Sequence, residues 1–345
     1  MQAERLSRLS NVLLDASFRS ELSPLFFDYL GWRVDTEEGL RYEFNADLSL
    51  FNHLNMKNKR VLEIGCGFGL RLIVFALLGA KKCVGIDISP EMVGDFKKLS
   101  DKLDLDVEAI CGDFLDYNFG EESFDIALMN ESISHIRDTS QLLTKTEKLL
   151  CPGGYIWIKD CNNGLFLLLP KKIEVWKKWR RAEYGPIDSK KATIGRQVDR
   201  LAYFEARINI IQSIDPSLDE NIVRQLAKKT RGMFGDEITQ AVEEYKKEKK
   251  LSKKPSARYR NPYTGEYEEL CFNPLRLAKQ IKDLGFRSKL VPPSETCIET
   301  NIYAPSRSLV EKSLLKMYMR VVSVSPIIIT TLIYPCFTIC AKKAN

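Results

Sequence analysis

The chain has 345 residues, of which 44% are hydrophobic and 28% are charged. These are ordinary globular proportions, and they exclude wholesale disorder, a collagen and a coiled-coil rod. Because the chain has only two histidines, His53 and His135, a histidine-cluster metal site is excluded and we expect no bound metal. The net charge of +6 is uneven: residues 1–160 carry 18 basic and 26 acidic side chains, whereas residues 161–345 carry 34 and 20. We expect the acidic and basic halves to face different partners.

The nine cysteines form no C-x-x-C pair, and several lie inside apolar runs. This usage is typical of reduced thiols, so we expect a cytoplasmic protein. Charged side chains interrupt the first thirty residues, and no export signal is expected.

The pattern of apolar residues predicts an N-terminal helical cap segment over 1–56 and a Rossmann-like core over 57–160. In the core, short apolar runs alternate with helical stretches, which predicts a mostly parallel sheet with helices on both faces. The expected strands are 60–64, 83–87, 107–111, 124–129 and 155–158, and the expected helices are 70–78, 90–103 and 139–150.

The second half of the chain departs from this alternation and then returns to it. Residues 161–270 predict a helical insertion after the fifth strand, which we expect to cap the substrate. Residues 271–305 are expected to end the core sheet with a helix and a hairpin of two strands, 287–291 and 295–303. These two strands bring the expected sheet to seven.

The segment that joins the first expected strand to the first expected helix is rich in glycine. It runs Glu63-Ile-Gly65-Cys-Gly67-Phe-Gly69, and such spacing brings backbone amides and a helix N-terminus close to a ligand. A dinucleotide loop has the pattern G-x-G-x-x-G, but here the third glycine comes one residue early and Leu70 stands in its place. The spacing therefore disfavours a nicotinamide-dependent oxidoreductase.

An acidic residue followed by G-x-G-x-G resembles the hallmark of the class I S-adenosylmethionine (SAM)-dependent methyltransferases, and this chain resembles their small-molecule and quinone-type members. The resemblance implies a Rossmann-like, seven-stranded sheet and SAM as the methyl donor. It assigns Asp87 to the ribose hydroxyls, Asp113 and Phe114 to the adenine, and Glu63 to the loop and the methionine amino group. The expected cofactor-binding residues are Glu63, Gly65, Cys66, Gly67, Gly69, Asp87, Ile88, Asp113, Phe114 and Asn130.

Several of these residues also have a purely structural interpretation. Glu63 could satisfy loop amides, Asp87 could cap the next helix, and Phe114 could belong to the core. Cys66 is better explained as a small residue that fills the loop. For the whole protein, the alternative is a SAM-binding scaffold that has lost catalysis.

Glu131 and His135 follow the fourth expected strand, at the edge where open α/β sheets bind ligands. His135 is the first candidate for a general base, because the pKa of imidazole, about 6.5, suits proton removal from a hydroxyl. Glu131 is the second candidate, and a His135 that merely packs at a helix start is the alternative. The Asn/Asp-Pro-Pro-Tyr signature of nucleobase and amide methylation is absent. We therefore expect transfer to an oxygen, carbon or nitrogen of a small-molecule, lipid or glycan acceptor, and no nucleic acid.

Residues 306–345 predict an amphipathic helix followed by a hydrophobic tail. The run from Val321 to Ala341 has no charged residue, which reaches the length of about 20 residues that a membrane-spanning helix needs. Pro326 and Pro335 interrupt it and equally suit interfacial or buried structure. A basic amphipathic helix leading into an apolar run predicts attachment to the cytoplasmic face of a membrane.

Overall fold

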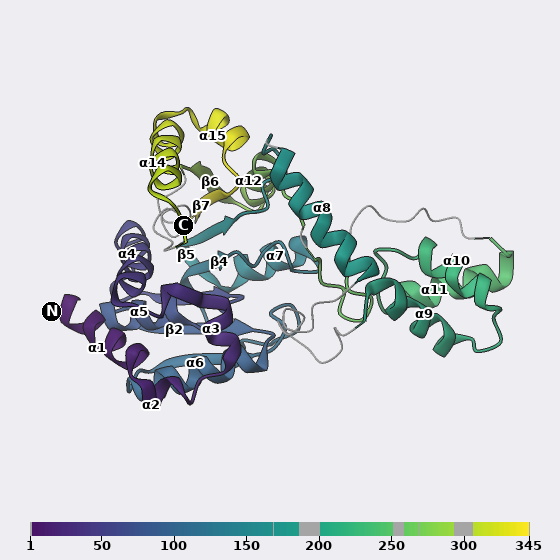
Figure 1. The fold of residues 1–345 in the computed structure, drawn as a ribbon, viewed down its shortest axis with the longest axis horizontal. Helices are drawn as coiled ribbons and strands as arrows, with labels where there is room; N and C mark the ends of the chain where they lie inside the picture. Colours follow the sequence, from purple (N-terminus) through teal and green to yellow (C-terminus); the bar gives the residue numbers. More distant parts are fainter. Residues whose placement is uncertain are drawn as a thin grey trace. The chain divides into compact units, whose positions relative to one another are not determined.

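In this computed structural model, the structure describes residues 2–167, 169–185, 201–250, 259–268, 270–292 and 306–344. The chain divides into two compact units (Figure 1). The first unit comprises Met1–Ile133, Ser140–Phe166 and Phe272–Asn345, and the second comprises Ser134–Thr139 and Leu167–Cys271.

The first unit is built on a seven-stranded sheet with the order β3-β2-β1-β4-β5-β7-β6. The strands are β1 (Arg60–Ile64), β2 (Lys82–Asp87), β3 (Val107–Cys111), β4 (Phe124–Asn130), β5 (Leu150–Asp160), β6 (Phe286–Val291) and β7 (Phe337–Lys343). β7 runs antiparallel to both of its neighbours, and the other neighbouring strands are parallel. This confirms the predicted fold class, a Rossmann-like and mostly parallel sheet.

Helices surround this sheet. Those of the first unit are α1 (Gln2–Leu14), α2 (Ala16–Arg19), α3 (Pro24–Leu30), α4 (Glu37–His53), α5 (Leu70–Leu78), α6 (Pro90–Lys102), α7 (Thr139–Leu149), α12 (Pro274–Asp283), α14 (Leu309–Val324) and α15 (Ile327–Ile333). α5 and α6 pack near β2 and β3, whereas α12 packs near β6 and β7. Among the described residues, no helix is long and apolar enough to cross a membrane.

The strand order reverses between β1 and β4, which lie side by side at the centre of the sheet. Open α/β sheets bind ligands outside the carboxyl ends of their strands at such a reversal. The glycine segment leaves the carboxyl end of β1 there, and α5 begins directly after it at Leu70. The topology therefore places the candidate site at this edge.

The end of the sheet contains a strand that was not expected. The strand paired with β6 is β7, from the supposed hydrophobic tail, and β7 also pairs with β5 along six residues from Phe337 to Lys342. A strand between two others is buried on both faces, so it has a continuous apolar sequence like that of a membrane segment. The expected strand 295–303 lies outside the described residues.

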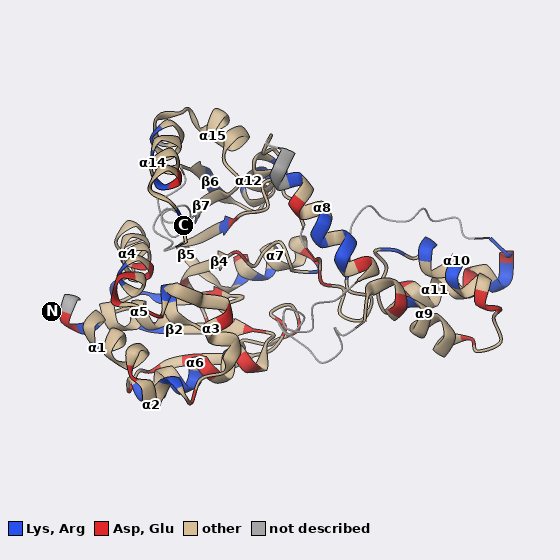
Figure 2. Ribbon diagram, viewed as in Figure 1, with Lys and Arg blue, Asp and Glu red and all other residues tan. Residues whose placement is uncertain are grey.

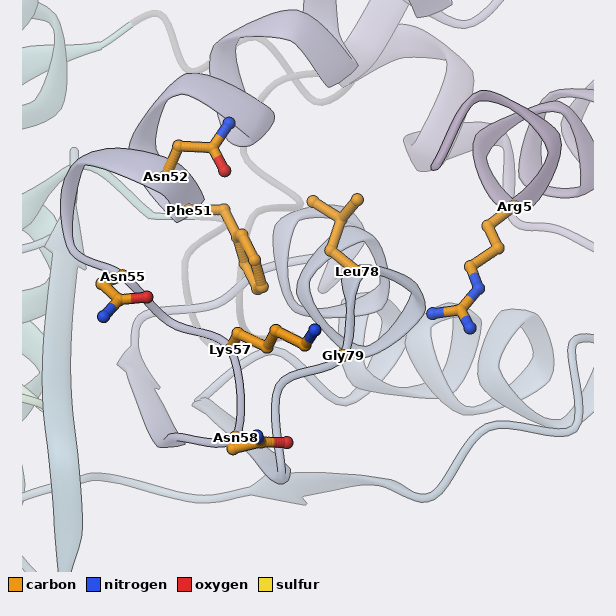
Figure 3. Close-up of a pocket in the computed structure, with 8 residues that line it drawn as sticks. All are labelled: Arg5, Phe51, Asn52, Asn55, Lys57, Asn58, Leu78 and Gly79. Atoms are coloured by element: carbon orange, nitrogen blue, oxygen red, sulfur yellow. The ribbon is translucent and has the colours of Figure 1, made fainter. Parts of the chain in front are cut away.

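The N-terminal helices share one hydrophobic core with α5. Leu13 of α1 and Phe51 of α4 are buried in the same cluster as Phe75 of α5, and the Arg5 guanidinium donates to the carbonyl of Leu77 over 2.9 Å. A cavity of about 460 Å³ lies where α4 and α5 end, lined by residues such as Arg5, Phe51 and Gly79 (Figure 3). Because it adjoins the amino end of β1, it lies away from the edge at which the glycine segment begins.

The second unit has a helical core of its own. Its helices are α8 (Leu169–Tyr184), α9 (Tyr203–Ile214), α10 (Glu220–Lys229) and α11 (Asp236–Glu248). Arg207 of α9 is completely buried, where its guanidinium pairs with Glu183 of α8 and donates to the carbonyl of Ala227 over 2.8 Å. A buried ion pair of this kind requires both partners, because either charge alone would be stranded away from water.

Candidate functional site

The glycine segment forms a tight loop whose backbone only glycine adopts readily. Gly65, Gly67 and Gly69 have φ values of +73°, +54° and +64°, in the left-handed region that costs other residues about 1–2 kcal/mol. Gly69 is the N-cap of α5, and no side chain there caps the helix. The loop therefore brings a helix N-terminus with its positive dipole end to the carboxyl edge of the sheet.

Two of these glycines also lack room for a side chain. A Cβ at Gly65 would lie 2.4 Å from the Cβ of Ser132, and one at Gly69 would lie 2.3 Å from the ring of Phe96. A Cβ at Gly67 would meet only the sulfur of Met92, at 3.7 Å. Gly67 is thus the open position of the loop, where a ligand can approach the backbone closely.

Asp87, the last residue of β2, holds this loop in place. Its Oδ2 accepts the Gly67 amide over 2.9 Å, and its Oδ1 accepts the Ser89 amide over 2.9 Å. Ser89 is the residue that caps α6, with its hydroxyl accepting from Met92. Asp87 therefore does not cap α6 itself. Its carboxylate lies against the glycine loop instead.

Glu63 at the end of β1 is buried, with 2% of its surface exposed. Its Oε1 pairs with the Arg71 guanidinium over 2.5 Å, and Arg71 also pairs with Asp47 of α4 over 2.7 Å. Burial raises the pKa of Glu63, with Arg71 opposing that shift and Asp87 adding to it. Burial likewise raises the pKa of Asp47 to about 7 against the effect of Arg71. Glu63 thus binds α5 and α4 through Arg71, instead of satisfying the loop amides.

One oxygen of Glu63 is left over. Oε2 is buried and has no hydrogen-bond partner in the described structure, and an unsatisfied buried carboxylate oxygen costs free energy. The charges of Asp87 and Glu63 both raise the pKa of the Cys66 thiol in the loop, after burial as the main cause. An ammonium group beside the loop would donate a hydrogen bond to Oε2 of Glu63. The methionine end of SAM carries such a group, so these residues fit this cofactor.

The remaining predicted cofactor residues also follow strand ends. Asp113 follows β3, and its Oδ1 accepts the Leu115 amide over 2.8 Å. Phe114 is buried, with its ring 5.7 Å from that of Phe119, so it belongs to the core and its contact with an adenine stays a prediction. Ile88 directly follows β2, and Asn130 is the last residue of β4.

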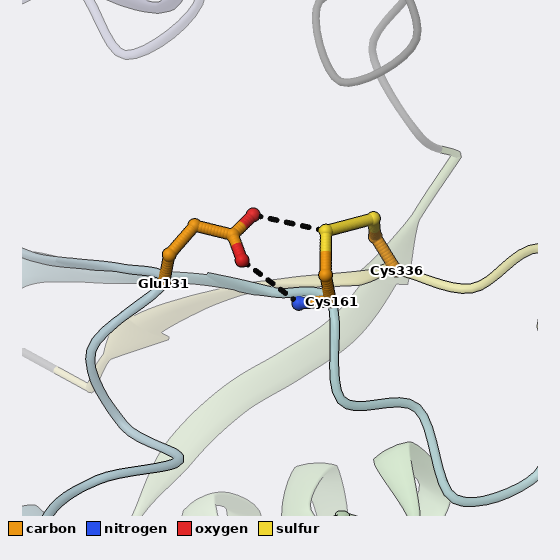
Figure 4. A group of neighbouring side chains, drawn as sticks. All are labelled: Glu131, Cys161 and Cys336. Carbon is orange, nitrogen blue, oxygen red and sulfur yellow. Dashed lines mark hydrogen bonds between the residues drawn. A yellow bond between two sulfur atoms is a disulfide. The ribbon is translucent and has the colours of Figure 1, made fainter. Parts of the chain in front are cut away.

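Glu131 directly follows β4, and its backbone has a left-handed conformation with a φ of +57°. Its Oε2 accepts the Cys161 amide over 3.2 Å, and its Oε1 lies 3.0 Å from the Cys161 sulfur (Figure 4). Lys159 lies 4.0 Å from the same carboxylate. Glu131 is therefore held at the carboxyl ends of β4 and β5, on the side of the sheet edge beyond the glycine loop.

Cys161 forms a disulfide with Cys336 (Figure 4), so the expectation of reduced thiols is wrong for this pair. The cysteines are 175 residues apart, a proximity that only the pairing of β5 with β7 creates. Ligand atoms of Glu131 and both cysteines lie within 4.8 Å of one another. Such a group would suit a metal ion only after reduction, because thiolates and not disulfides are the ligands.

His135 lies in the second unit. It is exposed, and its Nδ1 is 3.2 Å from the carbonyl oxygen of Tyr267, while its own carbonyl accepts the Tyr267 amide over 3.1 Å. Both contacts hold it within that unit. Its role as a general base stays a prediction.

Tyr29 of α3, of which 51% of the surface is exposed, is a neighbour of the glycine loop that sequence analysis did not consider. Desolvation by the surrounding protein raises the pKa of its hydroxyl, Arg33 opposes the shift, and the charges of Glu131 and Asp87 add to it. Its ring lies 5.9 Å from that of Phe68 in the glycine loop. The ring of Tyr29 therefore lies against the glycine loop.

A contact between α3 and α6 explains this position of Tyr29. Ser23 caps α3, and its amide donates to the buried carboxylate of Asp95 in α6 over 3.0 Å. No sequence motif indicates this long-range hydrogen bond. Only the start of α3 could be predicted, from the N-cap Ser23 and the Pro24 that follows it.

The family model described as a methyltransferase domain matches residues 55–230, just over half of the chain. The matched region contains the glycine loop together with Glu63, Asp87 and Asp113, which lie at or just after the ends of β1, β2 and β3. The chain belongs to the class I SAM-dependent methyltransferases. SAM is the cofactor of that family.

Two curated relatives carry the name ubiquinone biosynthesis O-methyltransferase. The protein from Paraburkholderia phymatum is 33% identical over 116 residues, which cover 33% of this chain and 49% of that protein. The protein from Cereibacter sphaeroides is 28% identical over 193 residues, which cover 49% of this chain and 74% of that protein. The chain thus matches about half the length of the first relative.

Solved structures of methyltransferases resemble the chain more distantly. The plantazolicin methyltransferase BpumL, in complex with a monoazolic desmethylPZN analogue and SAH, is 15% identical, with full coverage of both chains and a TM-score of 0.42. A SAM-dependent methyltransferase from Mesorhizobium loti is 12% identical, covering 86% of this chain and 98% of its own, with a TM-score of 0.43.

Proposed function

We propose that this enzyme transfers the methyl group of SAM to an oxygen of a small-molecule acceptor. The observation that carries the proposal is the glycine loop, where Gly67 is open to a ligand and the buried Oε2 of Glu63 has no hydrogen-bond partner among the described residues. The names of the curated relatives support oxygen as the acceptor atom.

Bound SAM supplies an activated methyl group on a sulfonium centre. The chain's own task is then to hold the acceptor, exclude water and remove the hydroxyl proton. We assign the removal of that proton to Glu131, which directly follows β4 at the edge of the sheet where β2 ends in Asp87. His135 is the second candidate base. Lipids and glycans with a hydroxyl group remain within this acceptor class.

The test uses SAM with a carbon-13 methyl group and a series of hydroxylated aromatic and aliphatic acceptors with apolar tails of graded length. We expect S-adenosylhomocysteine to form together with a product whose methyl resonance has the chemical shift of a methoxy group. A shift typical of a methylated amine or carbon would refute the oxygen assignment. SAM binding with no turnover on any acceptor or on cell extract would instead favour a scaffold that has lost catalysis.

The role of Glu131 is tested separately with Glu131→Gln and His135→Gln. Loss of a general base lowers kcat by about 10²- to 10⁴-fold, and we expect that loss for Glu131→Gln with SAM affinity unchanged. An equal loss in His135→Gln alone would transfer the role to the histidine. Unchanged kcat in both variants would show that neither side chain acts as a base.

A further inference from the structure

Apolar side chains lie exposed along α14 and continue onto α15. This α14–α15 strip consists of Val310, Leu314, Met317, Val321, Val324 and Ile328. Between 50% and 83% of the surface of each is exposed. Single exposed apolar residues are ordinary, but a contiguous set marks an interaction surface.

The strip is not the face by which α14 is attached to the protein. α14 packs inward through Met319 and Val322, which are buried in one cluster with Tyr334. The hydroxyl of Tyr318 further donates to the carbonyl of Ile333. The strip residues recur every three or four positions and therefore share a second side of the helix. The core does not require this second apolar side.

A row of cations accompanies the strip. Lys312, Lys316 and Arg320 follow one another at intervals of four residues, so they lie along one line of α14. The acidic residue of the helix, Glu311, accepts the amide and hydroxyl of Ser308 at the helix start. Figure 2 shows α15 without a charged residue. The two helices thus combine an apolar surface with a surplus of positive charge.

We propose that the α14–α15 strip docks this enzyme on the surface of an anionic lipid bilayer. An interfacial helix buries its apolar side at the boundary of headgroups and acyl chains, while flanking Lys and Arg meet lipid phosphates. The sixteen residues of α14 span about 24 Å, and no described helix can cross a membrane. α14 therefore lies in the plane of the interface. A second copy of the chain would bring the same cations to this surface, which opposes self-association.

The strip is firmly joined to the catalytic unit. The Asn163 side-chain amide, just beyond β5, donates to the carbonyls of Thr331 and Tyr334 over 2.7 and 2.9 Å. Thr330 donates from its hydroxyl to the carbonyl of Val322 over 3.3 Å. Docking of the strip therefore fixes the sheet and its cofactor site at the bilayer, whichever acceptor the enzyme uses.

The test is co-sedimentation of the full chain with vesicles of phosphatidylcholine alone or with added phosphatidylglycerol. We expect at least tenfold tighter binding to the anionic vesicles, weakened by high salt because exposed charges are screened. One variant combines Leu314→Ser, Met317→Ser and Val321→Ser, and another replaces Lys312, Lys316 and Arg320 by Gln. Each should lose at least tenfold in vesicle affinity. The matched control is Leu275→Ser, an exposed leucine on α12, which should bind like the parent.

Calorimetry with SAM shows that each variant is folded, because its cofactor site lies on other elements and should keep its affinity. Wild-type protein that stays in the supernatant with both vesicles would overturn the proposal. So would a folded Ser variant that binds vesicles like the parent. A dimer in light scattering that the Ser variant disrupts, without vesicle binding, would assign the strip to a second copy instead.

Discussion

Replacing Asp87 by Ala tests the cofactor site most directly. The carboxylate accepts the Gly67 and Ser89 amides over 2.9 Å each, and a carboxylate can accept about four hydrogen bonds in all. It can therefore hold the loop and still accept from a ligand. The family resemblance assigns it the two ribose hydroxyls.

The expected loss follows from these bonds. A hydrogen bond to a charged group contributes about 1.5–3 kcal/mol, so two of them amount to about 3–6 kcal/mol. Since about 1.4 kcal/mol corresponds to a tenfold change, the Kd for SAM should rise by about 10²- to 10⁴-fold. Asp87→Asn keeps one acceptor oxygen, so its Kd for SAM should lie between those of the parent and of Asp87→Ala. Orphaned amides in the alanine variant should also lower the free energy of unfolding by about 1–3 kcal/mol each.

Isothermal titration calorimetry with SAM and S-adenosylhomocysteine measures the affinity, and thermal unfolding without ligand measures the stability. Asp101→Ala is the matched control, because Asp101 is an exposed acid on α6 and should leave the affinity unchanged. A folded Asp87→Ala protein that binds SAM as tightly as the parent would refute the assignment of this carboxylate.

Three further predictions concern the loop and its neighbours. Burial raises the pKa of Glu63, and only the ionised carboxylate attracts an ammonium, so SAM affinity should fall as the pH is lowered through that raised pKa. In Glu63→Gln, calorimetry should find weaker SAM binding that no longer depends on pH in this way. If the pH dependence were preserved in this variant, Glu63 would be excluded as its source. Gly69→Ala combines a φ of +64° with a Cβ 2.3 Å from the Phe96 ring. Chemical denaturation should therefore show that its free energy of unfolding falls by about 2–5 kcal/mol. The control is Gly94→Ala on α6, whose Cβ would meet nothing within 4 Å and which should leave the stability unchanged or slightly raised. Alkylation of the denatured protein should label two more thiols after reduction than before, and peptide mapping should identify them as Cys161 and Cys336; full labelling of both without reduction would show that they are not bonded.

The parts of the site that sequence analysis predicted are those encoded locally. The loop from Glu63 to Gly69 is fixed by glycine conformations within seven residues, and Asp87 needs only the end of one strand to be found. Helix starts such as Ser89 were equally visible, because a cap and its amide are three residues apart.

What could not be predicted depends on contacts between distant segments. Arg71 joins Glu63 to Asp47 of α4, and no spacing in the sequence indicates that α4 lies there. The approach of Tyr29 to the loop depends on the bond from Ser23 to Asp95, 72 residues apart. The Cys161–Cys336 pair exists only because β7 returns beside β5.

The apolar C-terminal region shows why hydropathy alone could not decide between a membrane segment and a strand. Its apolar residues occur in two different environments. Those of β7 are buried inside the sheet, whereas those of the α14–α15 strip are exposed. Ile339 of β7 is completely buried between Ile158 and Leu290, while 54% of Leu314 is exposed. The same substitution should therefore have different effects at the two positions.

Ile339→Ala should lower the free energy of unfolding by about 2–5 kcal/mol, as expected for a truncated core residue. Leu314→Ala should change it by less than about 0.5 kcal/mol in the absence of lipid. Hydrogen exchange of β5 and β7 measures both effects in the first unit by itself, because the amides of these paired strands exchange when the sheet opens. Faster exchange in both variants would mean that α14 supports the sheet through the strip residues. Unchanged exchange in Ile339→Ala would contradict the central position of β7.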